Sequence, residues 1–96
     1  MSLGILTLYL QLPGCNSLKE KRGILKPVLA RLHREFNVST AEVGQMDQWR
    51  ESVLACAVVS NDPDHCMRVM QEVVKDTERT WPNLLVVDQR MELVAV

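Results

Sequence analysis

The sequence is poor in aromatic residues and has no excess of charge of one sign. It contains two Trp, one Tyr and one Phe, and eleven Lys and Arg oppose twelve Asp and Glu, which leaves a net charge of −1. A nearly neutral chain has no overall electrostatic attraction to nucleic acid or to an anionic membrane. So few aromatic side chains also leave little surface on which bases could stack. Any contact with nucleic acid must therefore come from a local concentration of charge.

Cysteine is scarce as well, and long apolar runs are absent. Cys15, Cys56 and Cys66 are odd in number and have no Cys-x-x-Cys spacing, which disfavours a disulfide framework and a zinc site. We find no signal peptide and no apolar run of about 18 residues. We therefore expect a cytoplasmic protein with reduced thiols, no cofactor and no membrane association. An apolar content of 47% in 96 residues suits one domain, residues 1–96.

Alternation and helical spacing predict the first half of the fold. Residues 5–12 alternate as a strand does, with a leucine face for the core, and Pro13-Gly14 ends the strand. Apolar residues at helical spacing predict a helix over residues 18–36. Pro27 stands inside this helix, where its ring clashes with the preceding turn, and predicts a bend near residues 23–27.

The second half repeats the pattern in a different order. Residues 37–43 alternate weakly and are typical of an edge strand, whereas residues 51–60 are apolar on both faces and favour a central strand. Asp62 and Pro63 are expected to begin a second helix as its N-cap and first residue, and Trp81-Pro82 to end it. Residues 84–96 form a last extended stretch that Asp88-Gln89-Arg90 interrupts, and we expect it either to bend or to extend past the sheet toward a partner.

The resulting order of elements, βαββαβ, predicts an α+β fold, the ferredoxin-like plait. In this fold a four-stranded antiparallel sheet carries two helices on one face. Right-handed crossovers place the first and third strands in the centre. That placement agrees with residues 5–12 and 51–60 being the most apolar of the four predicted strands.

The most specific stretch of the chain is Ser17-Leu18-Lys19-Glu20-Lys21-Arg22, at the start of the first helix. Ser17 and Glu20 form a capping box, in which the Ser17 hydroxyl accepts from the N–H of Glu20 and the Glu20 carboxylate accepts from the N–H of Ser17. The stretch also begins a basic element. Residues 15–36 hold six Lys and Arg against two acids, whereas residues 37–96 hold five against ten.

These bases suggest a binding surface. At 100° per residue, Lys19, Arg22, Lys26 and Arg34 follow one stripe of the helix, and Lys21 adds charge at its first turn. We interpret them as a basic ridge that contacts RNA phosphate through charge and position rather than through base readout. The alternative interpretation is a solvated helix face with no ligand.

A second candidate surface is the sheet face that has no helix. Tyr9 would lie on this face as its only aromatic residue, so base stacking there is disfavoured and a protein–protein surface, such as a homodimer, is favoured. Met46 and Trp49, in the loop before the third strand, are candidate anchors of a protein interface. For Trp49 the alternative interpretation is packing over an edge of the core.

The chain resembles the YlxP-like family, a bacterial family of unknown function. The resemblance rests on these stretches and residues: Leu12-Pro13-Gly14, Ser17–Arg22, Phe36-Asn37-Val38-Ser39, Ala41-Glu42-Val43, Asp47, Trp49 and Ala57-Val58-Val59-Ser60-Asn61-Asp62. It implies a small cytoplasmic protein with the ferredoxin-like plait. Members are often encoded beside genes for translation initiation and ribosome maturation, so the resemblance also implies an association with the ribosome or RNA. It supplies no catalytic residues.

An enzymatic interpretation finds little support in the residues. The chain shares its expected plait with acylphosphatases, which hold phosphate with an Arg in the loop after the first strand. Here that loop, Pro13-Gly14-Cys15-Asn16-Ser17, contains no Arg. We therefore expect a binding protein with no small-molecule substrate, with a phosphate-handling hydrolase and a homodimeric interaction module without nucleic acid as the alternatives.

Overall fold

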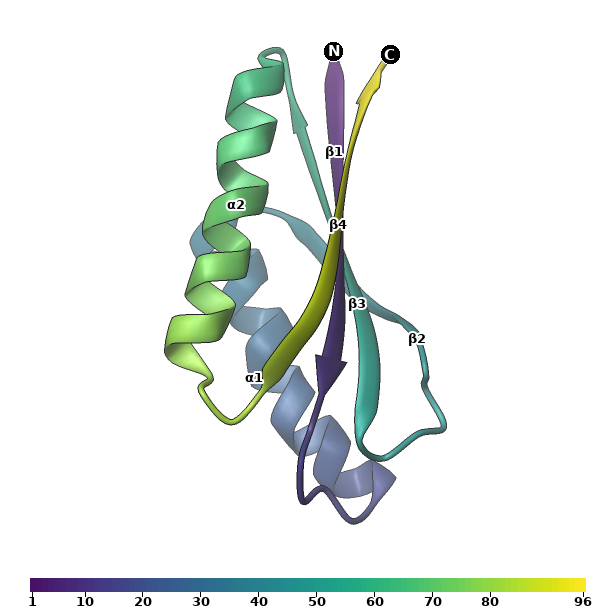
Figure 1. Cartoon of the computed structure of the whole chain (residues 1–96). Coiled ribbons are helices and arrows are strands. Elements are labelled where there is room, and N and C mark those ends of the chain that lie inside the picture. The colour runs from purple at the N-terminus through teal and green to yellow at the C-terminus, as the bar shows by residue number, and fades with distance from the viewer.

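Six elements make up the computed structural model, which describes residues 1–96, in the order βαββαβ (Figure 1). They are β1 (Ser2–Gln11), α1 (Leu18–Phe36), β2 (Ser39–Gly44), β3 (Glu51–Ser60), α2 (Pro63–Thr80) and β4 (Leu85–Ala95). The four strands form one antiparallel sheet in the order β2-β3-β1-β4. Both helices cover the same face of the sheet. The ferredoxin-like plait and the central positions of β1 and β3 are therefore confirmed.

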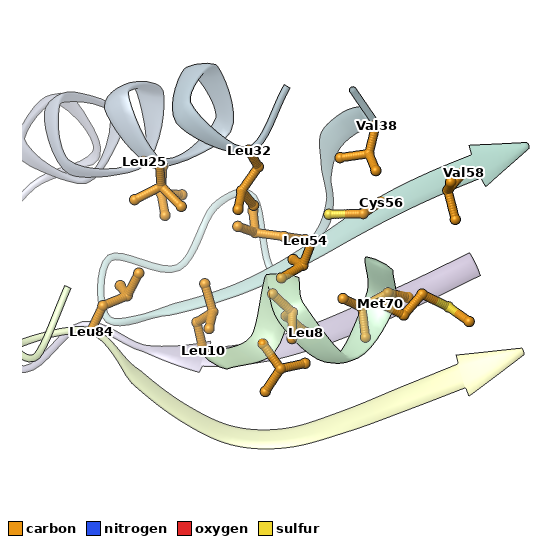
Figure 2. Packing of buried hydrophobic residues seen from close by; sticks show 14 of the residues in the cluster. Leu8, Leu10, Leu25, Leu32, Val38, Leu54, Cys56, Val58, Met70 and Leu84 are labelled. Carbon is orange, nitrogen blue, oxygen red and sulfur yellow. The ribbon is translucent and has the colours of Figure 1, made fainter. Parts of the chain in front are cut away.

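The core lies between the sheet and the helices, and the alternation of the central strands builds it. Leu6, Leu8 and Leu10 of β1 are buried, and so are Leu54 and Cys56 of β3. All five belong to one core cluster with residues of both helices, and Figure 2 shows Leu8, Leu10, Leu54 and Cys56 in it beside Leu25 and Leu32 of α1 and Met70 of α2. Intervening residues of both strands point to the opposite face, which no helix covers. The leucine face is therefore the core face, as the sequence predicts.

Several boundaries differ from the prediction for local reasons. Asn37 takes a left-handed conformation (φ 53°) as the C-cap of α1, so β2 begins at Ser39 rather than at residue 37. Asp62 caps α2 and Pro63 is its first residue, as expected. The charged residues 88–90 do not interrupt β4, because they lie on an exposed edge strand that pairs with β1 along its length. Val87 forms a bulge, since Tyr9 pairs with Asp88 and Leu10 with Val86.

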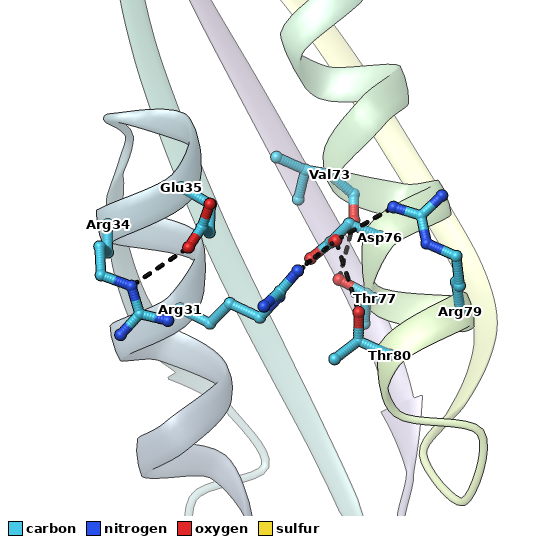
Figure 3. A network of polar contacts seen from close by, with 8 residues as sticks. All are labelled: Arg31, Arg34, Glu35, Val73, Asp76, Thr77, Arg79 and Thr80. Atoms are coloured by element: carbon cyan, nitrogen blue, oxygen red, sulfur yellow. Dashed lines mark hydrogen bonds and ion pairs between the residues drawn. The ribbon is translucent and has the colours of Figure 1, made fainter.

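An ion pair joins the two helices (Figure 3). Nε and Nη2 of Arg31 donate to the two carboxylate oxygens of Asp76 at 2.9 and 3.0 Å. Arg79 and Thr80 also donate to Asp76, at 3.3 and 3.4 Å. The hydrogen bonds from Arg31 hold the pKa of the Asp76 carboxyl below its ordinary value, against the effect of burial.

Neither helix combines the length and the apolar character that a membrane span requires.

Candidate functional site

The first turn of α1 is fixed by its own side chains. The Ser17 hydroxyl accepts from the N–H of Glu20 at 3.0 Å, as the sequence predicts. The Glu20 carboxylate accepts from the N–H of Asn16 at 3.2 Å, so the expected return bond to the N–H of Ser17 is wrong by one residue. Both residues satisfy donors at the helix end that would otherwise be unpaired. This capping explains Ser17 and Glu20 without any ligand.

Lys21 does not belong to the basic ridge, and the sequence-based assignment of this residue is wrong. Its side chain is buried, with 1% of the residue exposed, because its position on α1 faces β2 and the core. The Lys21 ammonium lies 2.8 Å from the Glu42 carboxylate and donates to the carbonyl of Gln45 at 2.7 Å. Ser52 donates to the same Glu42 oxygen at 2.7 Å. Lys21 therefore ties α1 to β2 and to the loop that follows it.

The other proposed contacts of the ridge point outward. Lys19, Arg22 and Lys26 are exposed, and no carboxylate lies within 4 Å of any of them. Arg34 is exposed too, but its Nε pairs with Glu35 at 3.2 Å (Figure 3). From here on, the basic ridge means Lys19, Arg22 and Lys26, with Arg34 as a partly neutralised end. The ridge presents three uncompensated positive charges on one side of α1.

The loop between β2 and β3 is held firmly at the same end of the molecule as the first turn of α1 (Figure 1). The Arg50 guanidinium donates to the carbonyl of Cys15 at 3.0 Å and to the Asn16 side chain at 3.2 Å. From this anchored loop Met46 and Trp49 project into solvent, 58% and 50% exposed. Trp49 does not cover an edge of the core, so the packing interpretation is wrong. An exposed Trp on an anchored loop suits an interface anchor.

The open face of the sheet is apolar in its centre and charged at one side. Tyr9 is half-buried between Val53 of β3 and Asp88 of β4, its partners in the neighbouring strands. Ala55, Ala57 and Ile5 continue the apolar centre, whereas β4 contributes Asp88, Arg90 and Glu92. Tyr9 therefore lies where the sequence places it, on the face that no helix covers.

The sequence did not reveal a cavity of about 740 Å³ between α1 and the segment that joins α2 to β4. Gly23, Ile24 and Pro27 line it from α1, and Trp81 and Pro82 line it from the other side. No titratable side chain lines this cavity, so it offers no acid–base pair for catalysis. The sequence features that line it are a proline inside one helix and a Trp-Pro pair at the end of the other. They lie about 55 residues apart, so the sequence does not show that they are close in space.

The three thiols are free and buried. Burial raises the pKa of the Cys56 thiol to about 11, so the thiol stays protonated at neutral pH. No three metal-ligating side chains of His, Cys, Asp or Glu gather anywhere in the structure.

Comparison with known sequences identifies one family. The profile of the family described as "Protein of unknown function (DUF503)" matches residues 3–91. The chain is also 40% identical over 58 residues to "Uncharacterized protein YlxP" of Bacillus subtilis strain 168. That alignment covers 60% of this chain and 63% of the length of the relative.

Comparison with solved structures gives the fold alone. The designed protein Foldit4 has a TM-score of 0.56 at 11% identity over 100% of this chain and 99% of its own. The designed protein LFR1 1, described as having a ferredoxin fold, has a TM-score of 0.55 at 11% identity over 100% and 87%. SnoaB, a cofactor-independent oxygenase of Streptomyces nogalater, has a TM-score of 0.53 at 11% identity over 99% and 92%.

Proposed function

Because the chain belongs to the DUF503 family of proteins of unknown function, we propose a role for it from its own surface. It is a cytoplasmic, non-enzymatic binding protein whose basic ridge holds the phosphate backbone of RNA. The ribosome is the proposed setting, in line with the family resemblance found in the sequence. The contacts are electrostatic and do not read base sequence.

One observation carries this proposal: Lys19, Arg22 and Lys26 lie exposed on one helix, and none has a carboxylate partner. The chain has more acids than bases overall, so acidic partners for these side chains were available in its composition. Bases near the N-terminus of a helix also oppose the helix dipole, by about 0.3–1 kcal/mol each at an exposed site. Phosphate groups would compensate both the unpaired charges and this cost.

The experiment is cosedimentation with ribosomal subunits and with free ribosomal RNA, each at two salt concentrations. The wild type is expected to associate, and more weakly at high salt. Three phosphate contacts correspond to a log–log salt slope of about −2 on single-stranded RNA. Changing Lys19, Arg22 and Lys26 together to Glu should abolish the association.

A matched control separates the ridge from general charge. Arg22→Glu/Lys26→Glu removes one Arg and one Lys from the ridge. Arg68→Glu/Lys75→Glu makes the same change in charge at two exposed bases of α2 that also lack carboxylate partners. The ridge variant should lose most of the association and the α2 variant should keep it. Equal losses in the two variants would contradict the proposal, and so would no loss in the triple variant.

A second candidate is a homodimer that uses the open face of the sheet, with no nucleic acid. It is favoured by the apolar centre of that face, where Ile5 and Tyr9 of β1 adjoin Val53, Ala55 and Ala57 of β3. Light scattering on the isolated protein tests this candidate, because a strict monomer at all concentrations would exclude it. Tyr9, Met46 and Trp49 are the proposed protein contacts in this case.

A further inference from the structure

The outer edge of β4 is unpaired, and the ladder on its inner side shows which groups face outward. Val96 and Met1 exchange two hydrogen bonds, so they are a hydrogen-bonded pair at the end of the β1–β4 ladder. Such pairs alternate along an antiparallel ladder, so Val94, Glu92 and Arg90 also bond inward to β1. The N–H and C=O groups of Gln89, Met91, Leu93 and Ala95 therefore point away from the sheet. In agreement, the N–H of Gln89 is taken by its neighbour, the Asp88 side chain, at 2.8 Å.

The two edges of the sheet differ in how they are protected. β2 is six residues long, and its register shifts between Glu42 and Gly44, which are features of a blunted edge. β4 is eleven residues long and carries no Pro and no Lys. The stretch after the bulge at Val87 pairs regularly with β1, and Leu93 and Val94 in it are exposed apolar residues. A long, regular and partly apolar edge is a template for another strand.

Charge favours one register for a second copy of this chain on that edge, the register that sets opposite charges against each other. We consider a two-fold axis perpendicular to the sheet that relates the β4 strands of the two chains. Residues that pair across the two strands have their side chains on the same face of the sheet, so one residue of β4 must pair with the same residue of the partner. An axis at Arg90 or at Glu92 would set like charges opposite each other. An axis at Gln89 meets the bulge at Val87 after two residues. An axis at Met91 sets Arg90 opposite the partner's Glu92, twice over, and pairs residues 88–94 without a bulge.

We propose that this protein forms a homodimer through β4, in which the two sheets join into one eight-stranded sheet with Met91 on the two-fold axis. The N–H and C=O of Met91 point away from β1, so Met91 forms a hydrogen-bonded pair with Met91 of the second chain. On each side of the axis, Gln89 of one chain forms such a pair with Leu93 of the other. Six hydrogen bonds between chains follow from these pairs, with the partner's Leu93 carbonyl replacing Asp88 at the N–H of Gln89. Arg90 and Glu92, which now pair only with each other at 3.0 Å, form a cluster of four charges.

On the helix side of the sheet, Met91 and Leu93 of both chains form a small apolar group. Met91 lies opposite the buried Leu6 in the ladder, so its side chain points to the helix side, as do those of Gln89 and Leu93. In the proposed register Leu93 is the diagonal neighbour of the second Met91, which is within reach of such side chains. The dimer therefore covers exposed apolar surface as well as the open hydrogen-bonding edge.

The test uses charge reversal in mixed chains, measured by light scattering and sedimentation equilibrium. The wild type should have twice the mass of one chain. Arg90→Glu alone and Glu92→Arg alone should each be monomeric, since each sets like charges opposite each other. An equal mixture of the two single variants should dimerise, because each chain then meets its opposite. Both positions are exposed enough for the variants to fold, which circular dichroism verifies.

A cross-link distinguishes the edge from the open face. The cysteines of the wild type are buried, and Met91→Cys adds a fourth, partly exposed thiol beside the two-fold axis, so mild oxidation should give a disulfide-linked dimer. Val59→Cys, at an exposed position of β3 on the open face, should not cross-link. Any of four results would overturn the β4 dimer: a monomeric wild type, dimeric single variants, a monomeric mixture, or cross-linking only through Val59→Cys. None of these outcomes bears on RNA binding by the ridge, because α1 lies on the β2 side of the sheet.

Discussion

Removing the buried charge of Lys21 should destabilise the protein without affecting its binding. Lys21 is 1% exposed and the Glu42 side chain 23% exposed, so Lys21→Met leaves a largely buried carboxylate without its cation. Breaking a buried ion pair from one side costs about 3–5 kcal/mol. Glu42 keeps the Ser52 hydroxyl and some water, which places the expected loss near the lower end, at about 3 kcal/mol. For a domain of this size that is a fall in Tm of roughly 12–24 °C.

The assay is urea unfolding followed by circular dichroism, with Lys19→Met as the matched control. Lys19 is exposed and has no carboxylate partner, so its change should cost less than about 0.5 kcal/mol. Lys21→Met/Glu42→Leu should recover most of the loss, because no buried charge is then left unpaired.

Two results would refute this account of Lys21. One is a free energy of unfolding for Lys21→Met within about 1 kcal/mol of the wild type, which would mean that the ion pair contributes little. The other is a folded Lys21→Met protein that loses as much RNA association as Lys26→Met, which would return Lys21 to the ridge.

Two further predictions concern the helices. The pKa of Asp76 is lowered by Arg31, so its carboxylate stabilises the fold above the unfolded pKa of about 3.9, and this contribution is lost as the pH falls through the lower folded value. Asp76→Asn should therefore be less stable at pH 7 and show a flatter acid limb in thermal melts from pH 7 to pH 2; an unchanged limb would contradict the pairing. Pro27 is exposed inside α1 and cannot donate to the carbonyl of Gly23. Pro27→Ala should raise the free energy of unfolding in urea by up to about 3 kcal/mol, and a loss of stability would show that Pro27 fits its site better than Ala.

The fold could be predicted because its signals are local. The leucines of β1 recur at every second position, the Ser17 cap stands three residues before Glu20, and Asp62-Pro63 precedes α2. Each signal acts within a few residues, and the order of elements then leaves few topologies. The predicted boundaries were wrong where one residue has an irregular backbone conformation, as Asn37 does with its left-handed C-cap.

The site could be predicted only in part, because the sequence shows which residues are charged but not whether each side chain is exposed or paired in the interior. Lys19 and Lys21 are two positions apart and chemically the same, yet one is exposed and the other reaches Glu42, 21 residues further along the chain. The 100° spacing of a helix separates their directions by 200°, and assigning Lys21 to the ridge on composition overlooked that angle. The pair between Arg31 and Asp76 was missed for the same reason, because its residues lie 45 positions apart.

The bond between Lys21 and the Gln45 carbonyl has an optical consequence. It joins the first turn of α1 to the loop of Trp49, whose side chain is 50% exposed, so we expect a ligand on Lys19 or Arg22 to change the surroundings of this indole. Trp81 is only partly exposed and lines the cavity beside Gly23 and Pro27 of α1, so its emission would overlap with that of Trp49. In a Trp81→Phe background, the fluorescence of Trp49 alone would report occupancy of the ridge without a label. Lys21, which is buried and not part of the ridge, would thus allow binding at the ridge to be followed by Trp49 fluorescence.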